Sequence, residues 1–276
     1  MMILFKVWFN NIYYIVMNQI IVIASELSII TRHNKYENIQ KAIDGVLNRS
    51  GIVKKHIPKS KIEESLLSLT EDQLTSIKQE LKLKADTTIE TVETAIKQKV
   101  LSRSFNENIT EEESKNKADS VLKTMPSLNK CLETSIKQDL RMKRGNIKED
   151  KNLNKTEIKK NIVIDSRNSQ LYEKELYHDS DKNYSIILRG KVDGMNEQYI
   201  VETKNRTKRL FNMIPEYEKV QLNAYMFITD KRNALHIECY NEEQNAVEYD
   251  FDESFWDDCV KKVIDFTDEY IIPQLD

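Results

Sequence analysis

Apolar residues recur at helical spacing in the first half of the chain and at strand spacing in the second half. Residues 86–101 are predicted to form a helix, because four apolar residues fall on one of its faces: Ile89, Val92, Ile96 and Val100. The segment Thr70–Gln73 has the sequence of a capping box and predicts that another helix begins there. Residues 104–117 are mostly polar, and we expect them to form a loop.

Alternating apolar residues after position 155 predict several strands. Strands are expected over residues 162–164, 170–177, 184–192, 198–204, 234–240 and 246–251, and helices over 216–229 and 253–271. Because Asp193-Gly194 is a turn signal, the strands on either side of it are expected to form a hairpin. Strands flanked by helices predict an α/β core with a mixed β-sheet, to which a helical N-terminal layer is added.

The chain is expected to divide into an N-terminal extension (1–16), a mainly helical region (17–140) and a core (141–276). The extension is apolar but shorter than the roughly 20 residues that a membrane span needs, so a membrane anchor is disfavoured. A buried first strand is the alternative interpretation of this segment, and Met17 is an alternative start. Ser25 is a candidate N-cap for a short helix.

Composition narrows the class of protein only slightly. The 276 residues are 39% hydrophobic and 32% charged, as expected of a globular protein, and the net charge of −3 argues against a uniformly basic surface. Nucleic-acid binding is still open, because it depends on where the positive charge lies. The three cysteines form no CxxC motif, which predicts reduced thiols in an intracellular protein and no secretion.

The chemistry is concentrated where the predicted strand 198–204 follows Asp193. Side chains alternate along a strand, so Glu202 and Lys204 lie on the same face as Ile200, and Asp193 brings in a second carboxylate. Two carboxylates and the main-chain carbonyl of Thr203 are the hard oxygen ligands that Mg²⁺ or Mn²⁺ prefers. The alternative interpretations are a simple turn at Asp193 and a surface ion pair between Glu202 and Lys204.

Several motifs in order then resemble the PD-(D/E)XK nuclease superfamily. Asp193 and the segment Glu202-Thr-Lys204 resemble its signature, and Gly190–Gly194 (GKVDG) resembles a segment of its RecB-type and lambda-exonuclease-like members. Further matching segments are Gln221–Tyr225 (QLNAY), Arg144–Glu149 (RGNIKE), and Ala24–Glu26 followed by Asn34–Tyr36, the last two resembling the opening motif of YqaJ-like viral recombinases. Residues 58–140 match no motif.

The resemblance implies a restriction-endonuclease-like fold and a magnesium-dependent deoxyribonuclease, an exonuclease acting on duplex DNA ends in recombination or repair. It implies metal ligation by Glu149, Asp193, Glu202 and Thr203, and catalytic roles for Asp193, Glu202, Lys204 and Gln221. A single-strand annealing protein and a second copy of the chain are the partners it suggests. The alternatives are a structure-specific endonuclease of the same superfamily and a DNA-binding subunit without activity.

DNA contacts are expected from the matched motifs and from basic residues on both sides of the site. The candidates are Ser25, Arg32, Lys35, Arg144, Arg206 and Tyr225. The lambda-exonuclease-like enzymes bind a 5′-phosphate with the help of an arginine, and no arginine of this chain matches that position closely. Arg32 and Lys35 are the candidates for this role. Basic side chains can contact the phosphate backbone, although a solvated charged surface is the alternative. The four histidines are scattered and are not expected to be metal ligands.

Overall fold

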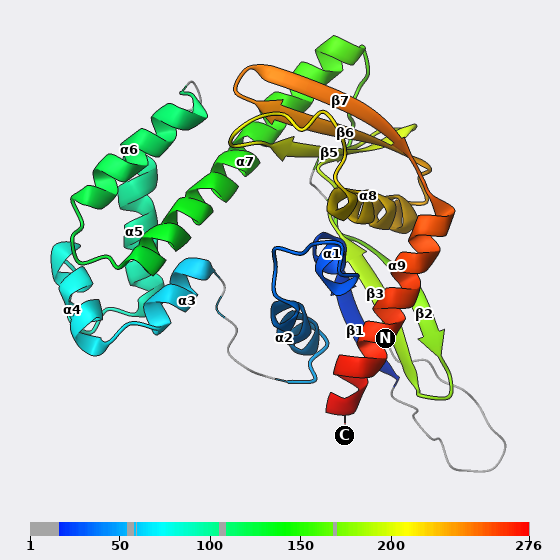
Figure 1. Ribbon diagram of the computed structural model, residues 1–276, viewed down its shortest axis with the longest axis horizontal. Helices are drawn as coiled ribbons and strands as arrows, with labels where there is room; N and C mark the ends of the chain where they lie inside the picture. Colours follow the sequence, from blue (N-terminus) through cyan, green and yellow to red (C-terminus); the bar gives the residue numbers. More distant parts are fainter. Residues whose placement is uncertain (1–16, 54–57, 59, 105–108, 168–169, 276) are drawn as a thin grey trace.

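The computed structural model describes residues 17–53, 58, 60–104, 109–167 and 170–275 (Figure 1). The predicted extension over residues 1–16 lies outside the described residues. The strands are β1 (Asn18–Ile23), β2 (Tyr172–Asp179), β3 (Tyr184–Gly190), β4 (Gly194–Met195), β5 (Tyr199–Asn205), β6 (Asn233–Tyr240) and β7 (Glu243–Asp250). The α-helices are α1 (Leu27–Ile30), α2 (Ile39–Arg49), α3 (Lys61–Leu67), α4 (Glu71–Glu80), α5 (Ile89–Ser104), α6 (Glu111–Lys123), α7 (Lys130–Lys160), α8 (Glu216–Thr229) and α9 (Glu253–Phe266).

Two mixed sheets form the centre of the molecule. The first has the order β1-β3-β2, with β1 parallel and β2 antiparallel to β3. The second has the order β4-β5-β6-β7, in which β5 and β6 are parallel and the other pairs antiparallel. Helices flank both sheets (Figure 1), so the predicted α/β class with mixed sheets and flanking helices is confirmed.

The predicted hairpin between the strands on either side of Asp193 is wrong. Both hydrogen-bonding edges of β3 are already used, by β1 and by β2. The chain therefore leaves the first sheet after Gly190, and the two-residue strand β4 pairs with β5 instead. The predicted strand over residues 162–164 is also wrong: Ile164 packs against α7 and β5 in a segment without strand pairing.

Helix α8 joins the two sheets through one apolar core. Its buried residues pack in one core with strand residues of both sheets. Strand β3 also passes close to α8 at Gly190. A Cβ atom at Gly190 would lie 2.8 Å from side-chain atoms of Tyr225 and Ile228, so only glycine allows β3 to pass this close to α8. The other face of the second sheet is covered by α7, where Leu153 packs against Val201 and Leu235.

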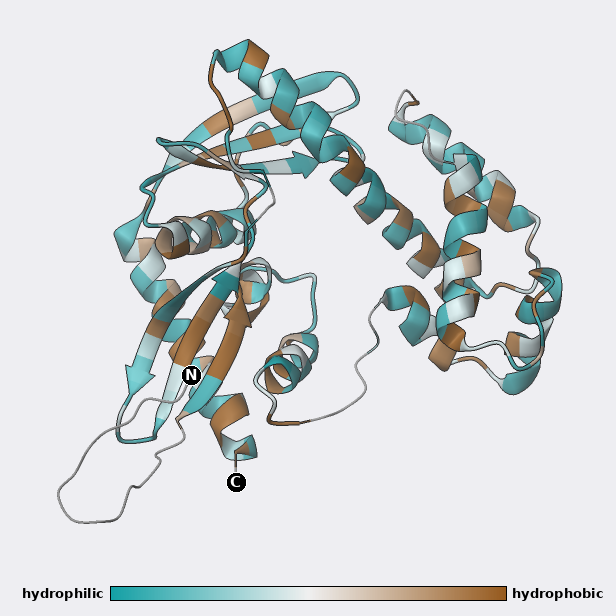
Figure 2. Ribbon diagram, turned by 180° about the vertical axis from the view of Figure 1, so that it is seen from behind, coloured by the Kyte–Doolittle hydropathy of each residue, from teal (hydrophilic) through white to brown (hydrophobic). Residues whose placement is uncertain are grey.

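Helices α3 to α6 and the N-terminal part of α7 form a helical cluster with an apolar core of its own (Figures 1 and 2). The capping box at Thr70 is confirmed, and Val92, Ile96 and Val100 of α5 are buried as predicted. The loop predicted over residues 104–117 is wrong from position 111 onward. Thr110 and Glu113 form a second capping box that begins α6, a signal hidden by the polar composition of that helix.

Strand β1 and helix α2 pack with the sheets and not with the helical cluster. Strand β1 pairs with β3 along its whole length, and α2 packs into the same core. Ser25 is not an N-cap: it lies inside a 3-10 turn, Ala24–Glu26, that follows β1 directly and has no side-chain cap. The division at residues 140 and 141 stays a prediction; α7 itself runs across it without a break.

None of the helices in the described ranges is both long enough and apolar enough to cross a membrane.

Candidate active site

Strand β5 is covered on both faces, and its alternating side chains point to different helices. Val201 and Asn205 face α7, where Asn205 accepts a hydrogen bond from Asn152 at 2.9 Å. Glu202 and Lys204 face the side of α8, where Lys204 donates a hydrogen bond to Gln221 at 2.9 Å. The period of two along the strand therefore places the acid and the amine on one face, as the sequence predicted.

Asp193 is brought to the edge of β5 by the segment that precedes β4. Its Oδ2 accepts hydrogen bonds from the backbone N–H of Thr203 at 2.7 Å and from the Thr203 hydroxyl at 3.2 Å. The adjacent Gly194 makes this approach possible, since a Cβ atom there would lie 2.6 Å from Ile164. Burial raises the pKa of Asp193 above its ordinary value, although the hydrogen bonds from Thr203 oppose the shift.

Glu202 is the most unusual group of the site. Its residue is only 3% exposed, and its Oε1 lies 2.6 Å from the ammonium of Lys204. Its Oε2 is buried and has no hydrogen-bond partner among the described residues. Burial, followed by the negative charge of Asp193, raises the pKa of Glu202 to about 8. A buried carboxylate oxygen without a partner costs free energy unless a cation or a proton offsets its charge.

Lys204 connects the acidic pair to helix α8. Burial disfavours its ammonium form, but the charge and the hydrogen bond of Glu202 prevail and raise the pKa of Lys204. The ammonium also donates to Oε1 of Gln221, whose Nε2 donates in turn to the hydroxyl of Tyr225 at 2.9 Å. Residues 221 and 225 are one helical turn apart, so both side chains reach the same side of α8.

The acidic residues fit a divalent cation in part. Asp193 and Glu202 offer carboxylate oxygens, and the partnerless Oε2 of Glu202 is the kind of atom that a cation would satisfy. Across the described ranges, no three His, Cys, Asp or Glu side chains are gathered closely enough to hold a metal ion. Glu149 of α7 is near enough for its charge to raise the pKa of Glu202. Its role as a ligand stays a prediction.

The six residues predicted to contact DNA differ in their exposure to solvent. Ser25 and Lys35 are exposed, and Arg32, which is also exposed, lies 3.4 Å from the hydroxyl of Tyr270. Tyr225 is only 5% exposed. A direct contact between its ring and DNA would require this side chain to leave the core. As DNA contacts, all four stay predictions.

Two of the three arginines predicted to contact DNA, Arg144 and Arg206, are already bound to carboxylates. Arg144 is 2% exposed and lies 2.9 Å from Glu111 of α6. Arg206 lies 2.6 Å from Glu218 and 2.5 Å from Glu238, and its guanidinium stacks on Phe211. DNA contacts from these arginines also stay predictions, and each guanidinium has a structural role in the protein alone.

A buried polar network that the sequence did not predict lies beside the site. Glu218 of α8 forms a hydrogen bond with His236 of β6 at 2.8 Å, in addition to its ion pair with Arg206. Glu238 accepts the backbone N–H groups of Phe211 and Asn212, and so fixes the loop that follows β5. The missed signal was a histidine and a glutamate two residues apart on a strand that is otherwise apolar.

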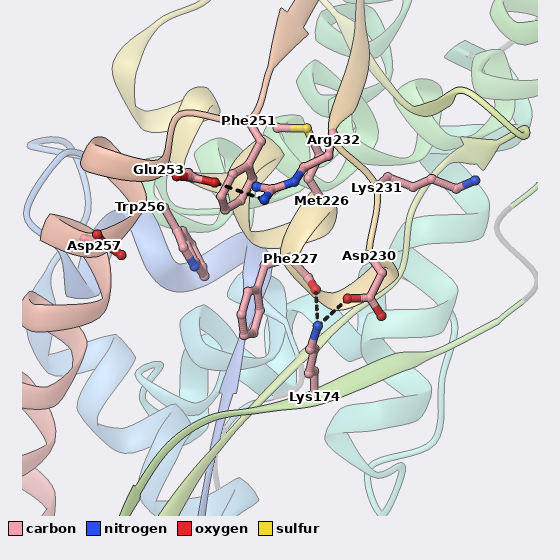
Figure 3. A pocket seen from close by; sticks show the side chains of 10 residues that line it. All are labelled: Lys174, Met226, Phe227, Asp230, Lys231, Arg232, Phe251, Glu253, Trp256 and Asp257. Carbon is pink, nitrogen blue, oxygen red and sulfur yellow. Dashed lines mark hydrogen bonds and ion pairs between the residues drawn. The ribbon is translucent and has the colours of Figure 1, made fainter.

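A cavity of about 370 Å³ lies away from these residues, between α8, α9 and the ends of β2 and β7 (Figure 3). Phe227, Phe251 and Trp256 line it. Two of its three basic groups are paired with acids of the same wall: Lys174 with Asp230, and Arg232 with Glu253. The lining holds three basic and three acidic side chains, so the cavity is not a second acidic or basic centre.

Comparisons with known proteins give distant likenesses only. No family model matches the chain, and no curated protein matches it. A solved phage-related exonuclease from Haemophilus somnus 129PT is 12% identical, with a TM-score of 0.37, over 48% of this chain and 70% of that one. A solved alkaline exonuclease from Laribacter hongkongensis is 10% identical, with a TM-score of 0.37, over 65% of this chain and 88% of that one.

The same alkaline exonuclease has also been solved in complex with dAMP, with similar figures. Because these TM-scores are below 0.5, the likenesses carry no argument about the activity, the substrate or the mechanism of this chain.

Proposed function

We propose that this chain is a divalent-metal-dependent deoxyribonuclease, and specifically an exonuclease that hydrolyses phosphodiester bonds at duplex ends. The observation that carries the proposal is the buried Glu202 beside Asp193, with one carboxylate oxygen partnerless among the described residues. A surface ion pair between Glu202 and Lys204 explains this poorly, because surface pairs leave both groups in contact with water. Glu202 is almost fully buried.

Asp193 and Glu202 would hold Mg²⁺ or Mn²⁺. The carbonyl of Thr203 and the carboxylate of Glu149, on α7, would supply further oxygen ligands. When bound, such a cation supplies a Lewis acid and lowers the pKa of water. The hydrogen bonds from Thr203 hold Asp193 in one orientation before any substrate arrives. Preorganised ligands of this kind reduce the cost of reaching the reactive geometry.

Lys204 would act on the substrate as an ammonium. It already donates to Glu202 and Gln221, and its third N–H is a donor for a phosphate oxygen or for the attacking water. Negative charge grows on the phosphate oxygens during hydrolysis, so a fixed cation beside them stabilises the transition state more than the ground state. Gln221, held by Tyr225, would keep the ammonium in place.

Recombination or repair is the proposed setting, with a single-strand annealing protein as a proposed partner; the ordered motifs of the sequence support both. Two further functions compete with the exonuclease. A structure-specific endonuclease would use the same residues, and a DNA-binding subunit would keep the fold without hydrolysis.

The test compares a linear duplex and a covalently closed circle of the same sequence, each with Mg²⁺ and with EDTA. An exonuclease degrades the linear DNA only in Mg²⁺ and leaves the circle intact. Cutting of the circle would identify an endonuclease. Binding without any Mg²⁺-dependent cutting would favour the DNA-binding subunit, and equal cutting in EDTA would exclude the metal mechanism.

A further inference from the structure

A small basic cavity lies where the helical cluster meets the loop that follows β5. It measures about 110 Å³ and is lined by residues of α6, α7 and the loop, among them Glu111, Lys115, Lys137, Arg141, Arg144 and Lys208. One water molecule needs about 10–15 Å³ of such space, so this cavity has room for a group of several polar atoms.

The lining carries five basic side chains and a single acidic one. Among the described residues, Lys115, Arg141 and Lys208 form no ion pair, and all three are exposed. Only Lys137 is offset by an acid from outside the lining, Asp119 at 2.7 Å. The cavity of about 370 Å³ differs in this respect, because its lining holds as many acidic as basic side chains and two of the basic ones are paired within it.

The acidic residue, Glu111, shows how basic side chains at the cavity bind an anionic group. Glu111 directs its Oε1 to Arg144 at 2.9 Å and to Lys148 at 3.1 Å. Arg144 is almost fully buried, which removes water from around this contact and strengthens its electrostatics. A carboxylate shared by two cations offers one centre of negative charge to several donors, as a phosphate oxygen would.

The cavity is fixed close to the proposed active site by the chain itself. Lys208 follows Lys204 by four residues, and Arg144 precedes Glu149 on the same helix. Two contacts hold the helical cluster against the second sheet: the first amide of α6 donates to Asn241, and Asn205 of β5 accepts from Asn152 of α7. The spacing between the cavity and the catalytic side chains is therefore set by ordered structure.

We propose that this cavity binds a backbone phosphate of the DNA substrate at a distance from the bond that is cut, and that the helical cluster α3–α7 serves to present it. The proposal rests on the proposed function, because it assumes a DNA substrate at Asp193 and Glu202. It assigns a role to the region 58–140, which matches none of the nuclease motifs that the rest of the sequence resembles. Lys115, Arg141 and Lys208 are the donors that reach the phosphate, and Glu111 competes with it.

The experiment measures the affinity of the full chain for an end-labelled duplex by fluorescence anisotropy in EDTA, so that no cleavage occurs. The double variant Lys115→Ala/Arg141→Ala is expected to bind at least about tenfold more weakly, as for loss of charge-assisted hydrogen bonds. Its slope of log affinity against log salt should fall by about 1 to 2. Glu111→Gln should bind more tightly than the wild type, because it removes the competing carboxylate.

The matched control is Lys123→Ala/Lys130→Ala, which removes the same charge from the same two helices at exposed positions outside the cavity. This control should bind within about twofold of the wild type. Equal losses in the two double variants would overturn the proposal, since net charge alone would then explain them. Weaker binding by a Glu111→Gln variant whose melting temperature matches the wild type would also overturn it, because removal of a competing carboxylate cannot weaken a phosphate site in an intact fold.

Inorganic phosphate separates two sources of the ligand. Stabilisation of the wild type by millimolar phosphate, lost in Lys115→Ala/Arg141→Ala without any change in DNA affinity, would show a site for free phosphate and overturn the assignment to DNA. Failure of the proposed nuclease gives a different result. The affinity losses would then remain, while Mg²⁺ would produce no cleavage in any variant.

Discussion

The Nζ atom of Lys204 lies 2.6 Å from Oε1 of Glu202, and both side chains project from β5 toward the side of α8. The two groups differ in access to solvent: the side chain of Lys204 is 24% exposed and that of Glu202 is 4% exposed. A substrate can therefore reach the amine, while the carboxylate behind it faces the interior. In the proposed mechanism, Lys204 would contact the phosphate and Glu202 would hold the cation, and the difference in exposure suits these two roles.

Lys204→Ala is expected to lower the rate of DNA cleavage at least about 100-fold, as for the loss of one positioned catalytic group. Its effect on DNA affinity should be small, about that of one phosphate contact. Both quantities are measured on one end-labelled duplex, with the exposed Lys191→Ala as the control for lost charge. Cleavage by Lys204→Ala at a near-wild-type rate would contradict the catalytic role.

Glu202→Gln is expected to abolish cleavage, because the amide replaces a carboxylate proposed to hold the cation. In the wild type, Mg²⁺ should raise the melting temperature because it binds the folded state only, and the variant should lose this response. Thermal unfolding is followed by circular dichroism with Mg²⁺ and with EDTA. An equal Mg²⁺ response in both proteins would show that Glu202 is not a ligand.

Ca²⁺ is expected to support DNA binding but not cleavage, whereas Mg²⁺ or Mn²⁺ supports both. Ca²⁺ accepts more ligands at longer distances, so it can hold the complex without reaching the reactive geometry. Affinity and cleavage are measured side by side with each cation at equal ionic strength. Rapid cleavage in Ca²⁺ would mean that the site does not select for a small cation.

Glu218 is expected to make the stability of the fold sensitive to acid. Burial alone would raise the pKa of Glu218, but its hydrogen bonds with His236 and Arg206 lower the pKa from 4.5 to about 2. A lowered pKa stabilises the folded state above the unfolded value, and this contribution is lost as the pH falls from about 4.5 toward 2.

Glu218→Gln should therefore lower the free energy of unfolding by about 3 kcal/mol at pH 7, and by less than half as much at pH 3. Urea titrations at the two pH values measure this difference. Glu253→Gln is the control: its ion pair with Arg232 is exposed, and the substitution should change the free energy of unfolding by no more than about 0.5 kcal/mol. A pH-independent loss in Glu218→Gln would contradict the assigned ion pair.

The sequence by itself determined the local elements and the composition of the site's central face. The period of two along residues 199–205 placed Glu202 and Lys204 together, and the capping box at Thr70 marked the start of α4. Gln221 and Tyr225 are one helical turn apart, which the structure confirms as a hydrogen-bonded pair. These relationships depend on neighbours within a few residues, so the chain's own geometry is sufficient to fix them.

Only the tertiary structure decided which elements meet. The hairpin expected around Asp193 does not form, because β1, more than 160 residues earlier in the chain, takes the edge of β3. The same applies to Glu218, whose partners Arg206 and His236 lie in the loop after β5 and on β6, and to Arg144, whose partner Glu111 lies on another helix. Such pairs form between residues that are distant in sequence, and the competition among packing arrangements that selects them leaves no local pattern in the chain.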